Sequence, residues 1–251
     1  AVIHRPVRTL EGVRNNFKKT IDIDIVRIAT GGTYEDPGRR LGLDTAVSLR
    51  VIERRPATLA ARFAFDWALK SGKSVVGSSK YTIQKATDGL FQEAVESVAK
   101  DYPSVPYRRE LFDALLAGIV MRPEAYGVVV CPNEYGDFLS DAACGLIGSI
   151  GLGESASYAF DDEGKVSSAM FDPSGGTAPD IAGKDLANPT AALLAFSSLL
   201  DHLGEESSAK ALRESILGCI AEGKCTRDIG GTLSTTAFVD AVLGHIKGIL
   251  F

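Results

Sequence analysis

The pattern of apolar and polar positions divides the chain into short strands that alternate with longer helices. The clearest helix covers residues 56–70, where polar side chains recur at every fourth position and apolar side chains fill the remainder. A helix with one thin polar stripe is usually buried on most sides. Residues 21–29 alternate and then become apolar, which is typical of a strand.

Other segments follow the same two periods. Strands are expected at residues 1–6, 45–53, 73–79, 105–111, 126–131, 157–160 and 168–171. Helices are expected at residues 81–100, 112–122, 190–202, 207–221 and 235–250, and a further helix after residue 131 contains Asp137 and Asp141. Strands that alternate with helices predict an α/β fold, with some antiparallel pairing in the first half of the chain.

The composition allows one or two packed domains and argues against several classes of protein. The 251 residues are 45% hydrophobic, which is ample for a sizeable core. The net charge is -5, and lysine and arginine form no block, so the sequence does not suggest a nucleic-acid partner. No apolar run reaches the ~20 residues that a membrane span needs, and no signal peptide is visible.

Cysteine and histidine usage favours a reducing compartment and disfavours zinc. The four cysteines form no CxxC pair and stand in apolar or mixed surroundings. We therefore expect reduced, mostly buried thiols, in the cytoplasm or the mitochondrial matrix. The three histidines are scattered along the chain, which makes a zinc site an unfavourable interpretation.

Two carboxylates, Asp137 and Asp141, stand four residues apart in the helix after residue 131. On a helix they share one face, where like charges repel unless a cation or a basic substrate lies between them. The same face continues through Cys144, Gly145 and Gly148, which are small, so a ligand or another backbone could approach closely. The alternative interpretation is that the two carboxylates only complement the dipole at the beginning of the helix.

Four stretches along most of the chain together resemble the β-decarboxylating dehydrogenases, the family that includes isocitrate and 3-isopropylmalate dehydrogenases. The sequence YGDFLSDAA at residues 135–143 resembles the metal-binding stretch of that family. GTAPDIAGKDLANP at residues 176–189 is similar to its cofactor loop, and KYTIQKATDGLF at residues 80–91 to the segment that begins with its catalytic lysine. DIGGTLSTTAF at residues 228–238 is similar to its C-terminal signature.

The resemblance implies an isopropylmalate-dehydrogenase-like fold with two domains in a three-layer α/β/α arrangement. Residues 1–147 would form the small domain, which binds substrate and metal and forms the dimer. Residues 148–251 would form the C-terminal half of the large, cofactor-binding domain, whose N-terminal section has no counterpart in this sequence. We therefore expect either further residues or a partner to cover the apolar surface of the incomplete large domain.

The same resemblance implies a divalent metal site. Asp137 and Asp141 would bind Mg²⁺ or Mn²⁺ together with the carboxylate and hydroxyl oxygens of the substrate. Asp113 would be the third acidic ligand, contributed by the other subunit of a dimer. Hard oxygen ligands of this kind suit either ion.

Further residues match the substrate-binding and catalytic positions of the family. Lys80 would serve in proton transfer from the substrate hydroxyl, and Tyr34 would protonate the enol. Arg5 and Arg27 match two substrate-binding arginines, whose planar guanidinium groups suit carboxylates. Read without the family, each of these side chains would be an ordinary surface, turn or ion-pair residue.

The cofactor loop implies NAD rather than NADP. The positions that match are Gly176, Thr177, Ala178, Asp180 and Asn188. Asp180 falls where NAD-dependent members hold the hydroxyls of the adenosine ribose, and a carboxylate there would repel an added phosphate. The function implied is metal-dependent, NAD-linked oxidative decarboxylation of a 2-hydroxy acid with a β-carboxylate, of the isocitrate or 3-isopropylmalate type.

Departures from the family pattern keep a second hypothesis open, a noncatalytic regulatory or structural subunit within a larger assembly. Ile28 stands where the family usually has an acidic residue, Thr82 where it has an asparagine, and Gly175 where it has a histidine. The last two positions belong to the cofactor site. On either hypothesis the expected partners are a homodimer or a hetero-oligomer of related subunits, with a small hydroxy acid as the substrate of the enzyme.

Overall fold

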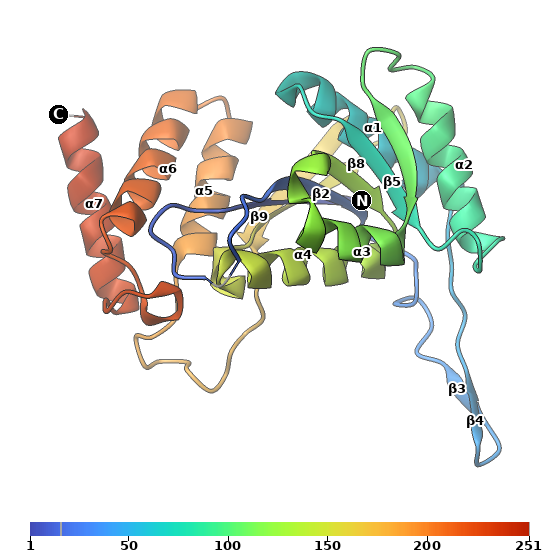
Figure 1. Cartoon of the computed structure of the whole chain (residues 1–251), viewed down its shortest axis with the longest axis horizontal. Helices are drawn as coiled ribbons and strands as arrows, with labels where there is room; N and C mark the ends of the chain where they lie inside the picture. Colours follow the sequence, from blue (N-terminus) through green and yellow to red (C-terminus); the bar gives the residue numbers. More distant parts are fainter. Residues whose placement is uncertain (16, 251) are drawn as a thin grey trace. The chain divides into compact units, whose positions relative to one another are not determined.

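The structure is a computed structural model that describes residues 1–15 and 17–250 (Figure 1). The chain forms two compact units. Unit 1 comprises Ala1–His4, Asp22–Ser140 and Ser157–Ala169, and unit 2 comprises Arg5–Ile21, Asp141–Ala156 and Met170–Phe251. The units therefore interleave along the sequence, whereas the predicted domains, residues 1–147 and 148–251, are continuous segments. That division into domains stays a prediction.

Seven strands form one mixed sheet in the order β6-β5-β7-β2-β1-β8-β9. The strands are β1 (Val2–Arg8), β2 (Asp22–Ile28), β5 (Val75–Ser79), β6 (Tyr107–Leu111), β7 (Val128–Cys131), β8 (Glu154–Phe160) and β9 (Val166–Pro173). In unit 1, β5 pairs in parallel with both β6 and β7, and β2 pairs in parallel with β7, with Ile25 opposite Val129. Parallel strands suit an α/β fold, because their connections must cross over through helices.

Both faces of the parallel strands in unit 1 are covered. Val128 and Val130 point into a core cluster with the alanine-rich side of α1 (Arg54–Ser71) and with Phe91 of α2 (Thr87–Ala99). Val129 points to the opposite face because side chains alternate along a strand, and it is also fully buried. Strands buried on both faces explain why residues 128–131 read as one continuous apolar run.

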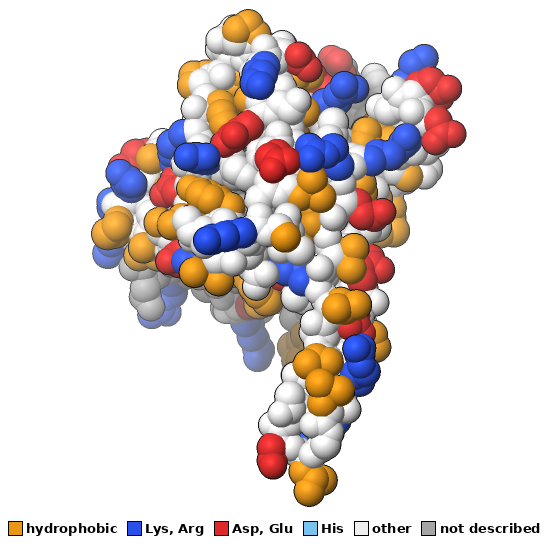
Figure 2. Space-filling view, turned by 90° about the vertical axis from the view of Figure 1, so that its right-hand side faces the viewer, with side chains coloured by type: hydrophobic (Ala, Val, Ile, Leu, Met, Phe, Trp, Pro, Cys, Tyr) orange, Lys and Arg blue, Asp and Glu red, His pale blue; other side chains and the backbone are white. Residues whose placement is uncertain are grey.

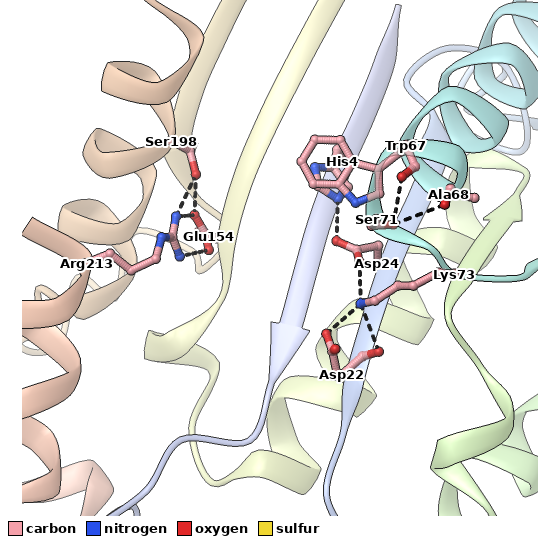
Figure 3. Close-up of polar contacts among 10 residues, drawn as sticks. All are labelled: His4, Asp22, Asp24, Trp67, Ala68, Ser71, Lys73, Glu154, Ser198 and Arg213. Carbon is pink, nitrogen blue, oxygen red and sulfur yellow. Dashed lines mark hydrogen bonds and ion pairs between the residues drawn. The ribbon is translucent and has the colours of Figure 1, made fainter. Parts of the chain in front are cut away.

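Unit 1 also contains a buried polar chain at the beginning of its strands (Figure 3). His4 Nε2 lies 2.8 Å from Asp24 Oδ1, and the Lys73 ammonium contacts Asp24 Oδ2 at 2.8 Å and Asp22 Oδ1 at 2.6 Å. The His4 ring packs against the Trp67 ring with centroids 4.2 Å apart. Each buried charge therefore has an opposite charge or a hydrogen-bond partner, as burial requires.

Unit 2 contains three helices that pack in sequence order, α5 (Thr190–His202), α6 (Glu206–Ala221) and α7 (Thr235–Leu250). A partly buried ion pair joins this group to the beginning of β8, where Arg213 donates to both carboxylate oxygens of Glu154 at 2.9 and 3.1 Å (Figure 3). Ser198 Oγ donates to the same carboxylate at 2.7 Å. No helix of the described chain is long and apolar enough to cross a membrane.

Most predicted elements are confirmed in type and position, and two differ most in extent. The helix expected at residues 81–100 begins only at Thr87, because the Lys80 backbone N–H is taken by the Asp88 carboxylate at 2.6 Å and residues 81–86 form turns. The strand expected at residues 45–53 is the short β4 (Thr45–Val47), which pairs with β3 (Arg39–Leu41) in an antiparallel hairpin. This hairpin is exposed, so no core extends β4 further.

Candidate active site

Helix α4 (Asn133–Ile147) begins directly after the buried strand β7 and carries the predicted metal ligands. Asp137 is half-buried and Asp141 is exposed, one helical turn further along. Gly136 lies between them and the beginning of the helix, and a Cβ there would overlap the Cβ of Arg27. The glycine therefore allows the side chain of Arg27 to cross the first turn of α4.

Arg27 is held in unit 1 between two side chains of α4. Its Nη1 forms an ion pair with Asp137 Oδ1, while Nε and Nη2 donate to Asn133 Oδ1 at 3.1 and 2.6 Å. Arg27 is only 7% exposed, so its guanidinium group is held in one position between Asn133 and Asp137. A fixed, fully charged guanidinium is suited to binding a carboxylate. Asn133 was not among the predicted site residues.

Tyr34 completes this constellation from the segment after β2. Its hydroxyl donates to Asp137 Oδ2 at 3.0 Å. Gly31 and Gly32 both have φ of 72°, which confirms the bend expected at this pair of glycines and brings Tyr34 over α4. The Tyr34 side chain is 55% exposed, so its hydroxyl is oriented by protein yet accessible to a ligand.

Lys80 and Asp113 form a second constellation in unit 1. Lys80 Nζ lies 2.6 Å from Asp113 Oδ1, and Asp113 stands in the first turn of α3 (Phe112–Met121). The hydrogen bond from Lys80 is the main reason that the pKa of Asp113 is lowered from its ordinary value. Asp113 is exposed, so an ionised carboxylate is presented to solvent beside an ammonium group.

A buried cluster positions Lys80, and sequence reasoning missed it. Asp88 is fully buried and accepts hydrogen bonds from the Lys80 backbone N–H at 2.6 Å and from Arg50 Nε and Nη2 at 3.0 and 2.8 Å. Arg50 also forms an ion pair with Glu134 in the first turn of α4. Arg50 thereby connects the helix of Asp137 to the segment of Lys80. Asp88 can be recognised from the sequence as an acidic residue in the first turn of a helix, but its partner Arg50 lies 38 residues away along the chain.

In unit 2, Arg5 and Asp141 face each other. Arg5 Nη1 lies 3.9 Å from Asp141 Oδ1, a longer contact than the Arg27 pair of unit 1. The Arg5 side chain is 12% exposed and the Asp141 side chain 52% exposed. Each predicted substrate-binding arginine therefore contacts one predicted metal ligand, Arg27 with Asp137 in unit 1 and Arg5 with Asp141 in unit 2.

The described residues contain no group of three or more histidine, cysteine or acidic side chains gathered as a metal site. Within unit 1, Asp113 and Asp137 are therefore not part of such a group among the described residues. Asp137, which is half-buried, and Asp141, which is exposed, are hard-oxygen donors on successive turns of α4, and donors of this kind suit Mg²⁺ or Mn²⁺. Completion of the set by Asp113 of another chain stays a prediction.

The predicted cofactor loop lies in unit 2 and is exposed from Gly176 to Asp180. Asp180 makes no hydrogen bond or ion pair with any residue that the structure describes, which leaves its carboxylate for a ligand. Asn188 is tied down instead, since its Nδ2 donates to Asp228 Oδ2 at 2.9 Å and its Oδ1 accepts from Thr190 N at 2.9 Å. The loop is therefore anchored at its C-terminal end and open at its N-terminal end.

The departures from the family pattern lie in different environments. Ile28 is buried in the core cluster of unit 1, where a carboxylate would need a buried partner. Thr82 is exposed in the turn after Lys80. The four cysteines are free and buried, as expected from the sequence.

Comparison with known proteins agrees with the fold and with the arrangement of the motifs. The family model described as isocitrate/isopropylmalate dehydrogenase matches residues 2–242. The chain therefore belongs to the isocitrate/isopropylmalate dehydrogenase family, which confirms the resemblance drawn from its motifs. A solved structure of isocitrate dehydrogenase from Methylococcus capsulatus superposes with a TM-score of 0.90 at 32% identity, covering 98% of this chain and 73% of that one. The predicted fold class is thereby confirmed.

Curated relatives carry several names within the family. Homoisocitrate dehydrogenase of Methanocaldococcus jannaschii is 39% identical over 231 residues, which are 91% of this chain and 64% of that protein. 3-Isopropylmalate dehydrogenase of Archaeoglobus fulgidus is 38% identical over 95% of this chain and 71% of its own length. In Dictyostelium discoideum, a mitochondrial regulatory subunit of isocitrate dehydrogenase [NAD] is 35% identical, over 96% of this chain and 67% of its own length. The chain thus spans roughly two thirds of the length of these relatives.

Proposed function

We propose that the protein catalyses metal-dependent, NAD-linked oxidative decarboxylation of a 2-hydroxy acid that carries a β-carboxylate, of the isocitrate or 3-isopropylmalate type. The observation that carries this proposal is the constellation around Asp137, which pairs with Arg27 and accepts from the Tyr34 hydroxyl. It places a guanidinium group that can bind a carboxylate, a phenol hydroxyl and a carboxylate that can bind a metal in contact with one another. Relatives named 3-isopropylmalate dehydrogenase and isocitrate dehydrogenase [NAD] subunit 2 support the same chemistry.

Substrate binding would use the two arginines and the two α4 carboxylates. Arg27 and Arg5 would bind substrate carboxylates through their guanidinium groups. Asp137 and Asp141 would hold the Mg²⁺ or Mn²⁺ ion. When bound, the ion would supply charge stabilisation at the substrate oxygens, and NAD would supply the hydride acceptor.

Proton transfer would use Lys80 and Tyr34. Lys80, in its neutral amine form, would take the proton of the substrate hydroxyl as hydride leaves the adjoining carbon, and Asp113 lies 2.6 Å from its nitrogen. After loss of CO₂, the Tyr34 hydroxyl would deliver a proton to the carbon of the enol. The hydrogen bond to Asp137 Oδ2 holds the Tyr34 hydroxyl beside the first turn of α4.

The active site would be shared between two chains. Lys80 and Asp113 of one chain form an ion pair. If Asp113 contributes to the metal site of another chain, Lys80 would therefore act in that same site. The hairpin of β3 and β4 supports association, since Leu41, Leu43 and Leu49 are 53%, 88% and 61% exposed. Figure 2 shows apolar side chains gathered along this hairpin. Exposed apolar patches of this kind mark protein contacts, so we propose a homodimer or a hetero-oligomer of related subunits.

The second candidate function is that of a noncatalytic subunit. A relative named as a catalytic subunit is 35% identical to this chain, and so is a relative named as a regulatory one, so overall similarity does not separate the two roles. Thr82 and Gly175, where the family has asparagine and histidine, favour the noncatalytic role. The complete set of Tyr34, Lys80 and Asp113 with the α4 carboxylates favours the enzyme.

Turnover separates the two functions. The full-length protein would be assayed with Mn²⁺ or Mg²⁺, with NAD or NADP, and with isocitrate, 3-isopropylmalate, homoisocitrate, malate and tartrate in turn. We expect NADH formation with one of the β-carboxylated acids and a preference for NAD over NADP through Asp180. Chelation of the metal should abolish this turnover. Folded protein that binds no nucleotide and turns over none of these acids would leave only the noncatalytic role.

The four free, buried cysteines support a reducing compartment, for which we propose the cytoplasm or the mitochondrial matrix.

A further inference from the structure

The loop of residues 176–188 contains two residues in an uncommon backbone conformation. Ala178 has φ of 41° and Asp185 has φ of 56°, and no other non-glycine residue that the structure describes has positive φ. This region is unfavourable for residues with a Cβ, and it persists only where the surroundings enforce it. Residues in this conformation concentrate at ligand-binding segments, where contacts with the surrounding structure hold the backbone in place.

Asp185 is held by the beginning of helix α7. Its Oδ1 accepts hydrogen bonds from Thr236 N at 2.8 Å and from Thr236 Oγ1 at 2.9 Å, and its backbone oxygen accepts from Thr235 N at 3.1 Å. The first N–H groups of a helix have no partner within it. Asp185 therefore caps α7 from a different segment of the chain, and its negative charge complements the helix dipole.

The helix also has a cap of its own, so the contacts of Asp185 fix the loop as much as the helix. Ser234 Oγ accepts from Ala237 N at 3.3 Å, which satisfies a third N–H of the first turn. Thr235 Oγ1 donates to Ala187 O at 2.5 Å, a second connection from the helix to the loop. The helix therefore has a local cap, whereas the loop at residue 185 depends on α7.

These contacts leave only the N-terminal part of the loop free. Asn188 anchors the C-terminal end through Asp228, and backbone hydrogen bonds join Ile181 to Ala178 and Lys184 to Ile181. The turns from residue 178 to 185 thus extend from Asp185 toward the exposed Asp180. Without the Asp185 side-chain contacts, these turns would be held only by their own backbone hydrogen bonds and by the connections at Ala187 and Asn188.

We propose that Asp185 is a positioning residue that holds the loop of residues 176–188 in its nucleotide-binding conformation before the nucleotide arrives. The inference rests on the proposed function, in which Asp180 and its neighbours bind NAD. Asp185 touches α7 and acts on the nucleotide only through the loop. A loop fixed in advance loses less conformational entropy on binding, so affinity rises without any new contact to the ligand.

The test compares three variants of the full-length protein. Asp185→Gly accepts the positive φ without strain but removes the cap. Asp185→Asn keeps an acceptor oxygen and tolerates the left-handed conformation. Asp240→Asn removes one exposed negative charge from α7 and is the matched control. NAD binding would be measured by calorimetry, and amide hydrogen exchange of residues 176–188 would be measured without nucleotide.

We expect D185G to raise the Kd for NAD about fivefold to tenfold, as for loss of one helix cap, and to speed exchange of the loop. D185N should stay within about twofold of the unaltered protein, and D240N should match it. If D185G lowers the melting temperature but leaves the NAD affinity and the loop exchange unchanged, Asp185 only stabilises α7 and the inference is wrong. If the unaltered protein binds no NAD, the proposed function fails and the inference fails with it.

Discussion

The Arg213 guanidinium holds both oxygens of the Glu154 carboxylate, with hydrogen bonds of 2.9 and 3.1 Å inside unit 2. Burial opposes ionisation of Glu154, but the hydrogen bonds and charge of Arg213 outweigh it, so the pKa of Glu154 is lowered from its ordinary value of 4.5. A lowered pKa in the folded state means that protons bind more readily to the unfolded chain. The stabilisation is therefore present above pH 4.5 and is lost as the pH falls through the lower pKa of the folded state.

Glu154→Gln leaves the half-buried Arg213 without its counter-charge. We expect the free energy of unfolding to fall by about 1–3 kcal/mol at pH 7, measured by urea denaturation. The difference from the unaltered protein should shrink as the pH falls below 4.5 toward the lower pKa at which Glu154 of the folded protein becomes protonated. The double variant E154Q/R213M should lose less than the two single variants together, because it leaves neither charge without its partner. Additive losses would contradict the coupling.

Sharing of the active site predicts complementation between two inactive variants. Asp113→Asn and Asp137→Asn should each abolish turnover, since each removes one proposed metal ligand. In a hybrid dimer, one of the two sites would receive Asp113 from one chain and Asp137 from the other, and would be intact. Mixing equal amounts with exchange of subunits should restore about a quarter of the unaltered activity, because half of randomly formed dimers are hybrids.

The control for complementation is a mixture in which both changes lie on the same chain. D113N/D137N mixed with unaltered protein forms hybrids in which neither site is intact, so activity should fall below simple dilution. Sedimentation would confirm that the subunits mix. No recovery from well-mixed single variants would show that Asp113 serves its own chain.

Cys131 should be chemically inert in the folded protein. Burial raises the pKa of its thiol to about 12, with a smaller opposing effect of Arg27. The thiolate is the reactive form, so iodoacetamide at pH 8 should label Cys131 only after unfolding, as mass spectrometry of peptides would show. Fast labelling of the native protein would contradict the burial of this strand.

The core of unit 1 depends on Phe65, which is fully buried against Tyr102 and Tyr107 with ring centroids 5.2 and 5.7 Å away. Phe65→Ala should lower the free energy of unfolding by about 3–5 kcal/mol through lost burial and a cavity. Ile83→Ala is the matched control, because Ile83 is 71% exposed and its truncation should change stability by less than about 0.5 kcal/mol. Equal effects of the two changes would be inconsistent with this core.

Local periodicity predicted most elements because one side of each is buried in the core of its own unit. The helix at residues 190–202 was predicted with the bounds that α5 has in the structure. Residues 81–86 were wrongly predicted as helix, because their period resembles that of α2 while a tertiary hydrogen bond to Asp88 holds the chain in turns. Such a bond leaves no mark on the local pattern.

The candidate site residues were named from motif resemblance, whereas the contacts between them could not be predicted. Arg27 and Asn133 are 106 residues apart, and only the parallel pairing of β2 with β7 brings them together. Arg50 lies in a segment without a family motif, so its contacts with Asp88 and Glu134 could not be anticipated. Sequence patterns indicate which segments are helices or strands, whereas contacts between distant side chains depend on the order of strands in the sheet.

The contact between His4 and Trp67 gives this protein a built-in optical probe. The chain has one tryptophan, and it belongs to unit 1. Its emission therefore reports the surroundings of α1 and β1 alone, whereas circular dichroism averages over the helices of both units. If the two units melt at different temperatures, the two signals will separate, and the stability of each unit can be read from one sample without any label.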